Sequence, residues 1–421
     1  MFPSSSLVNL MQGIDTNNTK MFHLRPGQLF QGVITQIYPG QLAQLKLGGM
    51  TITAKLEAQL QKGSRYWFQV LGGDGLPRLK VLENVSPLEK NSAPLLQQIG
   101  LTKGEVQEKV MTELIRDQIP FSPKQVKDGI ALVQQSSRNN QDSINLLIQL
   151  IKRGLPISKE TFICLETLYS QQSFGETIGK LKNSLQDSGL FRTFPQLYHL
   201  LQNLHFRNVS SSDETVQIIK EQITTASLLH LFERVGLKGM PMNDSRDILS
   251  RGELLKNLLL EFLQHSSPST DNRLQAEFLI HRLTALQLLS VENNFVLQQM
   301  VMQLPLYFMG RYRDLTIQWQ GKRNTSGEIN GDYCRILFFL EMSYLADVIV
   351  DIQIQNRIIS VTVYNEREKP QGIIDDLVPT LKESLSKLDY KLSTVIWKQP
   401  KIDPPTFINK VNDYQGVDIR I

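Results

Sequence analysis

The spacing of apolar residues divides the chain into stretches with different periods. From residue 21 to residue 88, apolar side chains recur at every second position in five short segments, and glycine-containing turns such as Pro39-Gly40 separate them. A period of two indicates strands with one buried and one exposed face. Five short strands predict a small β-barrel of the OB kind, closed or partly open. Residues 1–20 are polar and predict a flexible leader.

Between residues 89 and 303, apolar residues recur at intervals of three and four, which predicts a helical region. The segments "SINLLIQLIKRGLPIS" and "LQAEFLIHRLTALQLL" each place these residues on one helical face. Ser122 and Ser158 stand where N-caps are expected, and Pro123 suits the first position of a helix.

The alternation typical of strands returns in residues 304–399. Four strands are predicted there, at residues 315–320, 334–342, 347–354 and 358–365, with a turn at Gln355-Asn356 between the last two. An amphipathic helix follows, whose apolar stripe contains Ile374, Leu377, Val378, Leu381, Leu385 and Leu388. A last strand at 393–398 completes a C-terminal α+β sandwich of an antiparallel sheet and a helix, and residues 400–421 form a tail. The chain is therefore predicted to be a multi-domain α+β protein.

Composition narrows the class of protein. The chain has 421 residues, of which 41% are apolar and 20% charged, as in an ordinary globular protein. No apolar run reaches the roughly 18 residues of a membrane span, so no direct membrane insertion is expected. The net charge is only +4 and the charges are interspersed, which does not favour nucleic acid as a partner. Cys164 and Cys334 lie far apart and predict free thiols in a reducing compartment.

Residues that could carry out chemistry are sparse. The six histidines are scattered, and the chain contains no His-Glu-x-x-His, no Cys-x-x-Cys and no Gly-x-Ser-x-Gly motif. We therefore expect no metal, no cofactor and no enzymatic activity. Two alternatives stay open. Aromatic residues of the barrel could stack on bases, as in an OB-type nucleic-acid-binding protein, and a hydrolase site could be assembled from residues distant in sequence. The aromatic residues concerned are Phe30, Tyr38, Tyr66, Trp67 and Phe68.

One stretch, "LEMSYLADVIVDIQI" at 340–354, resembles a known family. Its apolar residues are similar to the pattern Leu-x-Pro-x-x-Leu-Gly-x-Val-x-Val-x-Leu of the C-terminal domain of flagellar hook-length control proteins. The resemblance continues through "ISVTVYN" and the helix to "STVIW". The barrel and helices before it resemble the longer, Gram-positive type of this family. The chain departs from the pattern at Met342, where proline is usual, at Ala346, where glycine is usual, and at Asp389-Tyr390, which replace a glycine. It also lacks a Pro/Gln-rich linker.

The resemblance implies a protein that acts by contact. In this family the C-terminal domain contacts the cytoplasmic domain of the export-gate switch protein of the flagellar type III apparatus, and changes export from hook-type to filament-type substrates. The implied location is the cytoplasm, with export through the apparatus as an alternative, and a monomer is expected. The candidate contact residues are apolar and come from the strands and the helix: Val348, Val350, Leu381, Leu340, Met342 and Leu345. The alternative for all six is a place in the core, because alternating apolar strand residues are normally buried.

Overall fold

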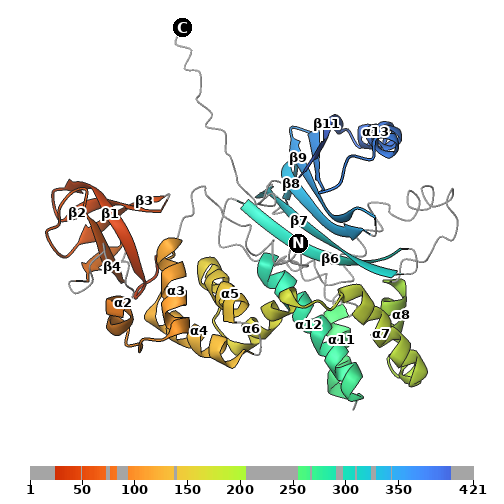
Figure 1. Ribbon diagram of the computed structural model, residues 1–421, viewed down its shortest axis with the longest axis horizontal. Helices are drawn as coiled ribbons and strands as arrows, with labels where there is room; N and C mark the ends of the chain where they lie inside the picture. The colour runs from red at the N-terminus through yellow and green to blue at the C-terminus, as the bar shows by residue number, and fades with distance from the viewer. Residues whose placement is uncertain are drawn as a thin grey trace, which may run out of the picture. The chain divides into compact units, whose positions relative to one another are not determined.

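The computed structural model (Figure 1) describes most of the chain between residues 24 and 399. The described ranges are 24–48, 50–72, 76–82, 93–136, 140–204, 255–265, 268–290, 297–308, 311–323, 329–342 and 344–399. The predicted leader at 1–20 and the predicted tail at 400–421 lie outside them. The chain divides into two compact units, one of described residues up to Glu166 and one of those from Thr167 onward.

The first unit begins with a closed five-stranded barrel, which confirms the predicted fold of this region. Its strands follow the order β1-β2-β3-β5-β4, with β3 and β5 parallel. They are β1 (Leu29–Tyr38), β2 (Leu42–Leu47), β3 (Met50–Leu56), β4 (Arg65–Leu71) and β5 (Arg78–Val81). Phe30, Ile34, Leu45 and Phe68 fill the interior and are almost completely buried. The alternation read from the sequence therefore places the expected residues inside the barrel.

The described residues of the first unit also form five helices, which are labelled in Figure 1. They are α2 (Ala93–Gln98), α3 (Glu105–Arg116), α4 (Pro123–Gln135), α5 (Asn140–Arg153) and α6 (Lys159–Glu166). Ser122 caps α4 as predicted, since its hydroxyl accepts a hydrogen bond from the Gln125 amide at 3.1 Å. The amide of Leu29 on β1 donates to the Phe121 carbonyl oxygen at 2.7 Å, and the Phe121 amide donates back at 3.1 Å. These two bonds join the barrel to the helices.

The second unit combines helices with a six-stranded sheet. Its helical elements are η1 (Thr167–Tyr169), α7 (Phe174–Asp187), η2 (Leu190–Arg192), α8 (Pro195–Asn203), α11 (Leu255–His265), α12 (Thr270–Ser290) and α13 (Gln371–Ser386). Its strands are β6 (Leu297–Phe308), β7 (Arg311–Arg323), β8 (Ile329–Met342), β9 (Ala346–Gln355), β10 (Ile358–Tyr364) and β11 (Lys391–Lys398). The sheet order is β11-β10-β9-β8-β7-β6.

The strand pairs are antiparallel from β6 to β10, while β10 and β11 are parallel. The last pair is parallel because α13 lies between the two strands in sequence, and a helical crossover returns the chain in the same direction. The turn between β9 and β10 consists of Asn356 and Arg357, both with positive φ, one residue beyond the predicted Gln355-Asn356. This is the backbone that a two-residue hairpin turn requires.

Two predicted boundaries are wrong. The predicted helical region at 89–303 is divided between the two units at Glu166, and strand structure begins at Leu297 instead of Leu304. Gln299 and Gln303 on β6 are both buried, so this strand lacks the apolar alternation that would have marked it in the sequence. The helices α7 and α12 contact β6 and therefore belong with the sheet.

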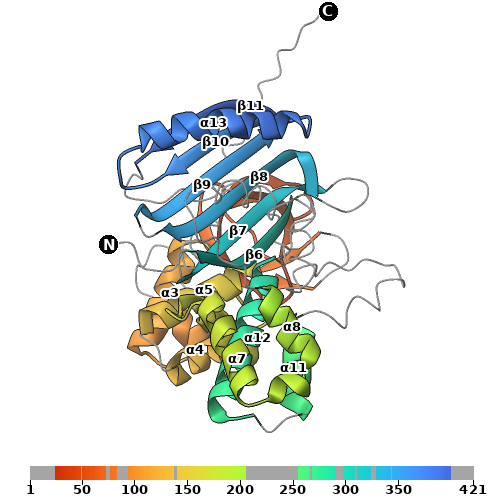
Figure 2. The same cartoon turned by 90° about the vertical axis from the view of Figure 1, so that its right-hand side faces the viewer.

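Helices cover the two faces of the sheet at opposite edges (Figure 2). Val378 and Leu385 of α13 pack with Trp319, Ile352 and Val361 on one face. On the other face, α7 lies against β6 and β7. Because neighbouring residues of a strand point to opposite faces, the register of β7 to β10 separates the two sets of residues.

The contact between α7 and β7 is close and polar. The Asp314 carboxylate accepts hydrogen bonds from the amides of Phe174 at 2.7 Å and Gly175 at 2.9 Å, at the N-terminus of α7. Burial raises the pKa of the Asp314 carboxyl, while these two donors and Arg282 act in the opposite direction. The carboxylate thus satisfies helix amides that have no partner within the helix, and it joins segments 139 residues apart.

Candidate protein-interaction site

The structure divides the six candidate contact residues by burial. Val348 is buried, and Val350 packs into the apolar cluster between the sheet and α13. Leu340 and Leu345 are half-buried. Met342 and Leu381 are exposed, at 38% and 39%. Val348 and Val350 are therefore core residues, as the alternative interpretation expected. Met342 and Leu381 lie where a partner can reach them.

Four of these residues share the sheet face that α13 covers. Leu340 is paired with Val348 in the register of β8 and β9, and Met342 is paired with Ala346. Val350 lies two residues after Val348 and therefore points to the same side. The sequence stretch 340–350 thus builds one side of a continuous apolar face that ends at the exposed Met342.

Helix α13 buries only half of its apolar stripe. Val378 and Leu385 pack against the sheet. Leu377 is 48% exposed, and Leu388, which follows the end of the helix at Ser386, is 57% exposed, so these residues stay outside the core together with Leu381. The stripe predicted from the sequence was wider than the contact that α13 makes, because periodicity gives the apolar side of a helix and not the breadth of the surface beneath it.

The turn before β9 is held by a residue that the sequence reasoning missed. Asn365 is 1% exposed, and its Nδ2 donates to the carbonyl oxygens of Leu345 at 2.7 Å and Asp347 at 2.9 Å. Its Oδ1 accepts from the amide of Arg367 at 2.8 Å. This side chain fixes the loop beside Met342. An asparagine as the last residue of a predicted strand was the available signal.

Ala346 lies in this turn with φ at +56°, a conformation that favours glycine. A left-handed backbone costs a non-glycine residue about 1–2 kcal/mol, and the greater freedom of glycine in the unfolded chain offsets part of that. We expect Ala346→Gly to raise the free energy of unfolding of this unit by about 1 kcal/mol, measured by urea denaturation.

The exposed Ala131, inside helix α4, provides the matched control. Ala131→Gly should lower stability by about 1 kcal/mol, because glycine is unfavourable inside a helix. A loss of stability in Ala346→Gly would show that the methyl group contributes packing that outweighs the backbone strain.

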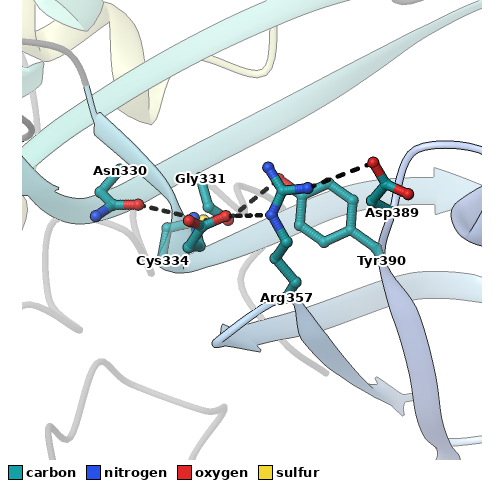
Figure 3. A network of polar contacts seen from close by, with 7 residues as sticks. Asn330, Gly331, Cys334, Arg357, Asp389 and Tyr390 are labelled. Carbon is teal, nitrogen blue, oxygen red and sulfur yellow. Dashed lines mark hydrogen bonds and ion pairs between the residues drawn. The ribbon is translucent and has the colours of Figure 1, made fainter.

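The C-terminal turn of α13 is fixed by a polar network (Figure 3). Asp389 has φ at +61°, and the amide of Tyr390 donates to the Leu385 carbonyl oxygen at 2.9 Å, which closes the helix. The guanidinium of Arg357 lies 5.4 Å from the centre of the Tyr390 ring, and its Nε donates to Asp332 Oδ1 at 2.8 Å. The hydroxyl of Tyr390 donates to the Gly331 carbonyl oxygen at 3.3 Å. The network ties α13 to the start of β8 and to the β9–β10 turn.

Acidic side chains lie on the reverse of the sheet at this end. Glu341 and Asp347 are directly paired across β8 and β9, and because they alternate with Met342 and Val348 they point to the opposite face. Burial raises the pKa of the Asp347 carboxyl, and the negative charges of Glu341 and Glu366 raise it further. Arg313 lies 3.8 Å from Glu341 and offsets part of this charge. The sheet end at Met342 therefore carries apolar side chains on one face and acidic side chains on the other.

Elsewhere in the part of the chain that the structure describes, few side chains are placed to bind a metal ion or to react. It holds no group of three histidine, cysteine or acidic residues that could bind a metal ion. The thiol of Cys334 is buried, and burial raises its pKa, which keeps it protonated. Burial lowers the pKa of His281. Among the same residues, no helix has the length and apolar character needed to cross a membrane.

The barrel aromatics that could stack on bases differ in their exposure. Phe30, Phe68 and Trp67 are buried, and Trp67 packs edge-on against Phe121 with 6.3 Å between ring centres. Tyr66 packs partly into the barrel core, whereas Tyr38 is 41% exposed. Base stacking needs exposed rings along a basic groove. Burial of three of the five aromatic candidates therefore weighs against the nucleic-acid alternative.

Comparison with curated proteins shows a similarity to part of a bacterial protein. The chain is 30% identical over 152 residues to the uncharacterised protein YlqG of Bacillus subtilis (strain 168), a match that covers 35% of this chain. It spans 26% of the length of that relative. No family model matches the chain, and no solved structure matches it.

Proposed function

We propose that this protein acts by protein contact, as flagellar hook-length control proteins do, and that its C-terminal sheet and α13 bind the cytoplasmic domain of an export-gate switch protein. The observation that carries the proposal is the exposure of Met342 and Leu381, two of the six residues that the family resemblance marks. Exposed apolar side chains on a rigid scaffold are typical of contact sites. Binding would bias the export apparatus towards filament-type substrates.

The backbone supports the resemblance on which this proposal rests. The family pattern has glycine where this chain has Ala346 and where it has Asp389-Tyr390. Ala346 and Asp389 both have positive φ, at +56° and +61°. These are the conformations for which glycine is preferred. The chain therefore keeps, at both positions, the backbone that would explain the family's glycines.

The proposal is tested by titrating the full chain with a purified export-switch cytoplasmic domain by calorimetry. We expect Leu381→Asp and Met342→Asp each to weaken binding at least ~10-fold, because a charge at an apolar contact commonly costs more than ~1.4 kcal/mol. Leu274 on α12 is 58% exposed and lies outside the site, so Leu274→Asp is the matched control and should bind normally. Absence of heat at several hundred micromolar, or equal losses in all three variants, would reject the proposal.

A further inference from the structure

Helix α13 contains a proline in its middle, at Pro379. Because proline has no N–H, the carbonyl oxygen of Asp375 lacks the donor four residues on, and the proline ring also crowds that carbonyl. Proline disfavours helical backbone at the residue before it, which here is the β-branched Val378. The helix is therefore weakest between Asp375 and Pro379. We name residues 371–378 the first half of α13 and residues 379–386 its second half.

The first half is poorly capped and has a sequence that disfavours a helix. Its N-cap is Pro370, whose side chain makes no hydrogen bond to the helix, and its first turn has no acidic residue to complement the helix dipole. Its sequence, QGIIDDLV, contains a glycine and three β-branched residues, all of which are weak helix formers. The ion pair between Lys369 and Asp375, at 3.8 Å, is too exposed to add much stability.

Most side chains that the structure describes in the first half do not pack against the sheet. Ile374 is half-buried, and Val378 packs into the apolar cluster between α13 and the sheet. The exposed residues of the first half are Gln371, Gly372, Asp375, Asp376 and Leu377. Tertiary contacts therefore hold this half mainly at its last residue, next to the proline.

The second half is fixed at its end by the network of Figure 3. The amide of Tyr390 closes the last turn on the Leu385 carbonyl oxygen, and the Tyr390 hydroxyl donates to the Gly331 carbonyl oxygen on β8. Arg357 lies over the Tyr390 ring and bonds Asp332. Leu385 packs into the apolar cluster. The second half is thus tied to β8 and to the β9–β10 turn, whereas no comparable network holds the described residues of the first half.

We propose that α13 is a hinged flap, whose first half leaves the sheet by bending at Pro379 while its second half stays in place. Prolines inside helices are a common cause of such bends. Among the side chains that the structure describes, opening takes only Ile374 and Val378 away from partly buried positions. Opening therefore costs far less than unfolding of the unit, as is usual for local opening of a segment with few apolar contacts.

Opening changes the surface that the proposed function uses. Val378 packs in the same apolar cluster as Val350 and Ile352, so its departure uncovers part of that cluster near Leu381. A partner that binds both Leu381 and the uncovered surface would shift α13 towards the open form. This link rests on the proposed function, whereas the opening itself does not.

The test is amide hydrogen exchange of the full chain without a partner, read by mass spectrometry. After correction for intrinsic rates, residues 374–378 should exchange at least ~10-fold faster than residues 383–386. Pro379→Ala restores the N–H that faces the Asp375 carbonyl oxygen. It should slow exchange of the first half at least ~10-fold and leave residues 383–386 unchanged, because an interior proline is far less favourable in a helix than alanine.

Pro195, the first residue of α8, gives the matched control. A proline at that position removes no hydrogen bond from the helix, so Pro195→Ala should leave exchange in α8 and α13 within about twofold. Arg357→Ala should speed exchange of the Tyr390 amide and leave the first half unchanged. A melting curve for each variant checks that the fold is intact.

A helix that opens as one unit would give different results. Equal protection of the two halves in the unmodified chain, equal slowing of both halves by Pro379→Ala, or equal acceleration of both by Arg357→Ala would overturn the proposal. Because exchange is measured without a partner, such a failure leaves the binding titration of the proposed function unaffected.

Discussion

Replacing Asp351 by alanine is expected to lower the free energy of unfolding of the sheet unit by about 3–5 kcal/mol. The Arg335 guanidinium on β8 and the Asp351 carboxylate on β9 form a two-bond pair, with Nε–Oδ1 at 2.8 Å and Nη2–Oδ2 at 2.7 Å. The side chain of Asp351 is 3% exposed and that of Arg335 is 18% exposed. Removing the carboxylate leaves a positive charge largely cut off from water, and this produces the loss.

A double variant provides the control. Arg335→Met with Asp351→Leu removes both charges and keeps apolar volume, and it should recover most of the lost stability because a buried pair gains little over well-packed apolar residues. The stabilities of Asp351→Ala and of the double variant are measured by urea denaturation. Unfolding is monitored by tryptophan fluorescence, because Trp319 and Trp397 lie in this unit. If the double variant is as unstable as Asp351→Ala, the loss of stability does not come from leaving the charge of Arg335 without the Asp351 carboxylate.

Replacing Gly179 by valine is expected to cost about 3 kcal/mol, the upper end of the range for an overpacked contact. A Cβ at Gly179 would lie 2.6 Å from the Cε2 atom of Tyr312 on β7, and a Cβ at Gly175 would lie 2.9 Å from Cδ1 of the same ring. Both glycines are buried, so α7 can approach the sheet this closely only without side chains there. The melting temperature of the unit should fall accordingly.

Two further variants make this result specific. Adding Tyr312→Ala to Gly179→Val removes the clashing ring and should restore at least half of the loss. In α13, a Cβ at Gly372 meets no atom within 4 Å, so Gly372→Ala should be neutral or slightly stabilising. If Tyr312→Ala gives no recovery, the cost of Gly179→Val comes from the helix itself and not from contact with β7.

The local pattern of the chain predicts most elements, because periodicity reports which side of an element is buried. The barrel strands, the cap at Ser122 and helix α13 are all recovered from such patterns. The start of β6 is not, since buried glutamines replace the apolar side chains there. On β7, Gln318 is completely buried, and neither side-chain amide atom has a hydrogen bond to a residue that the structure describes. A polar residue at that position gives no sign of burial in the sequence.

In the candidate site, too, local patterns predict some features and miss others. The alternation of 340–350 places the right residues on one face, but it cannot tell Met342 from Val348, because exposure depends on what else reaches that face. Asn365 and Arg357 hold the site's two turns through contacts with residues that are distant in sequence, such as Asp332. The pattern of a single sequence carries no information on such pairs. It also does not give the breadth of the sheet surface beneath α13, so the partial exposure of the apolar stripe could not be predicted.

The parallel pairing of β10 with β11 has a consequence for synthesis on the ribosome. Strands β6 to β10 can pair in the order in which they are made, each with its predecessor. The outer edge of β10, however, stays open until α13 and then β11 have been made, and the amide of Asn365 must wait for the Lys398 carbonyl oxygen, 3.1 Å away in the folded sheet. An open strand edge is a site of mispairing between chains. Chains interrupted within α13 are therefore expected to be the aggregation-prone intermediates of this protein.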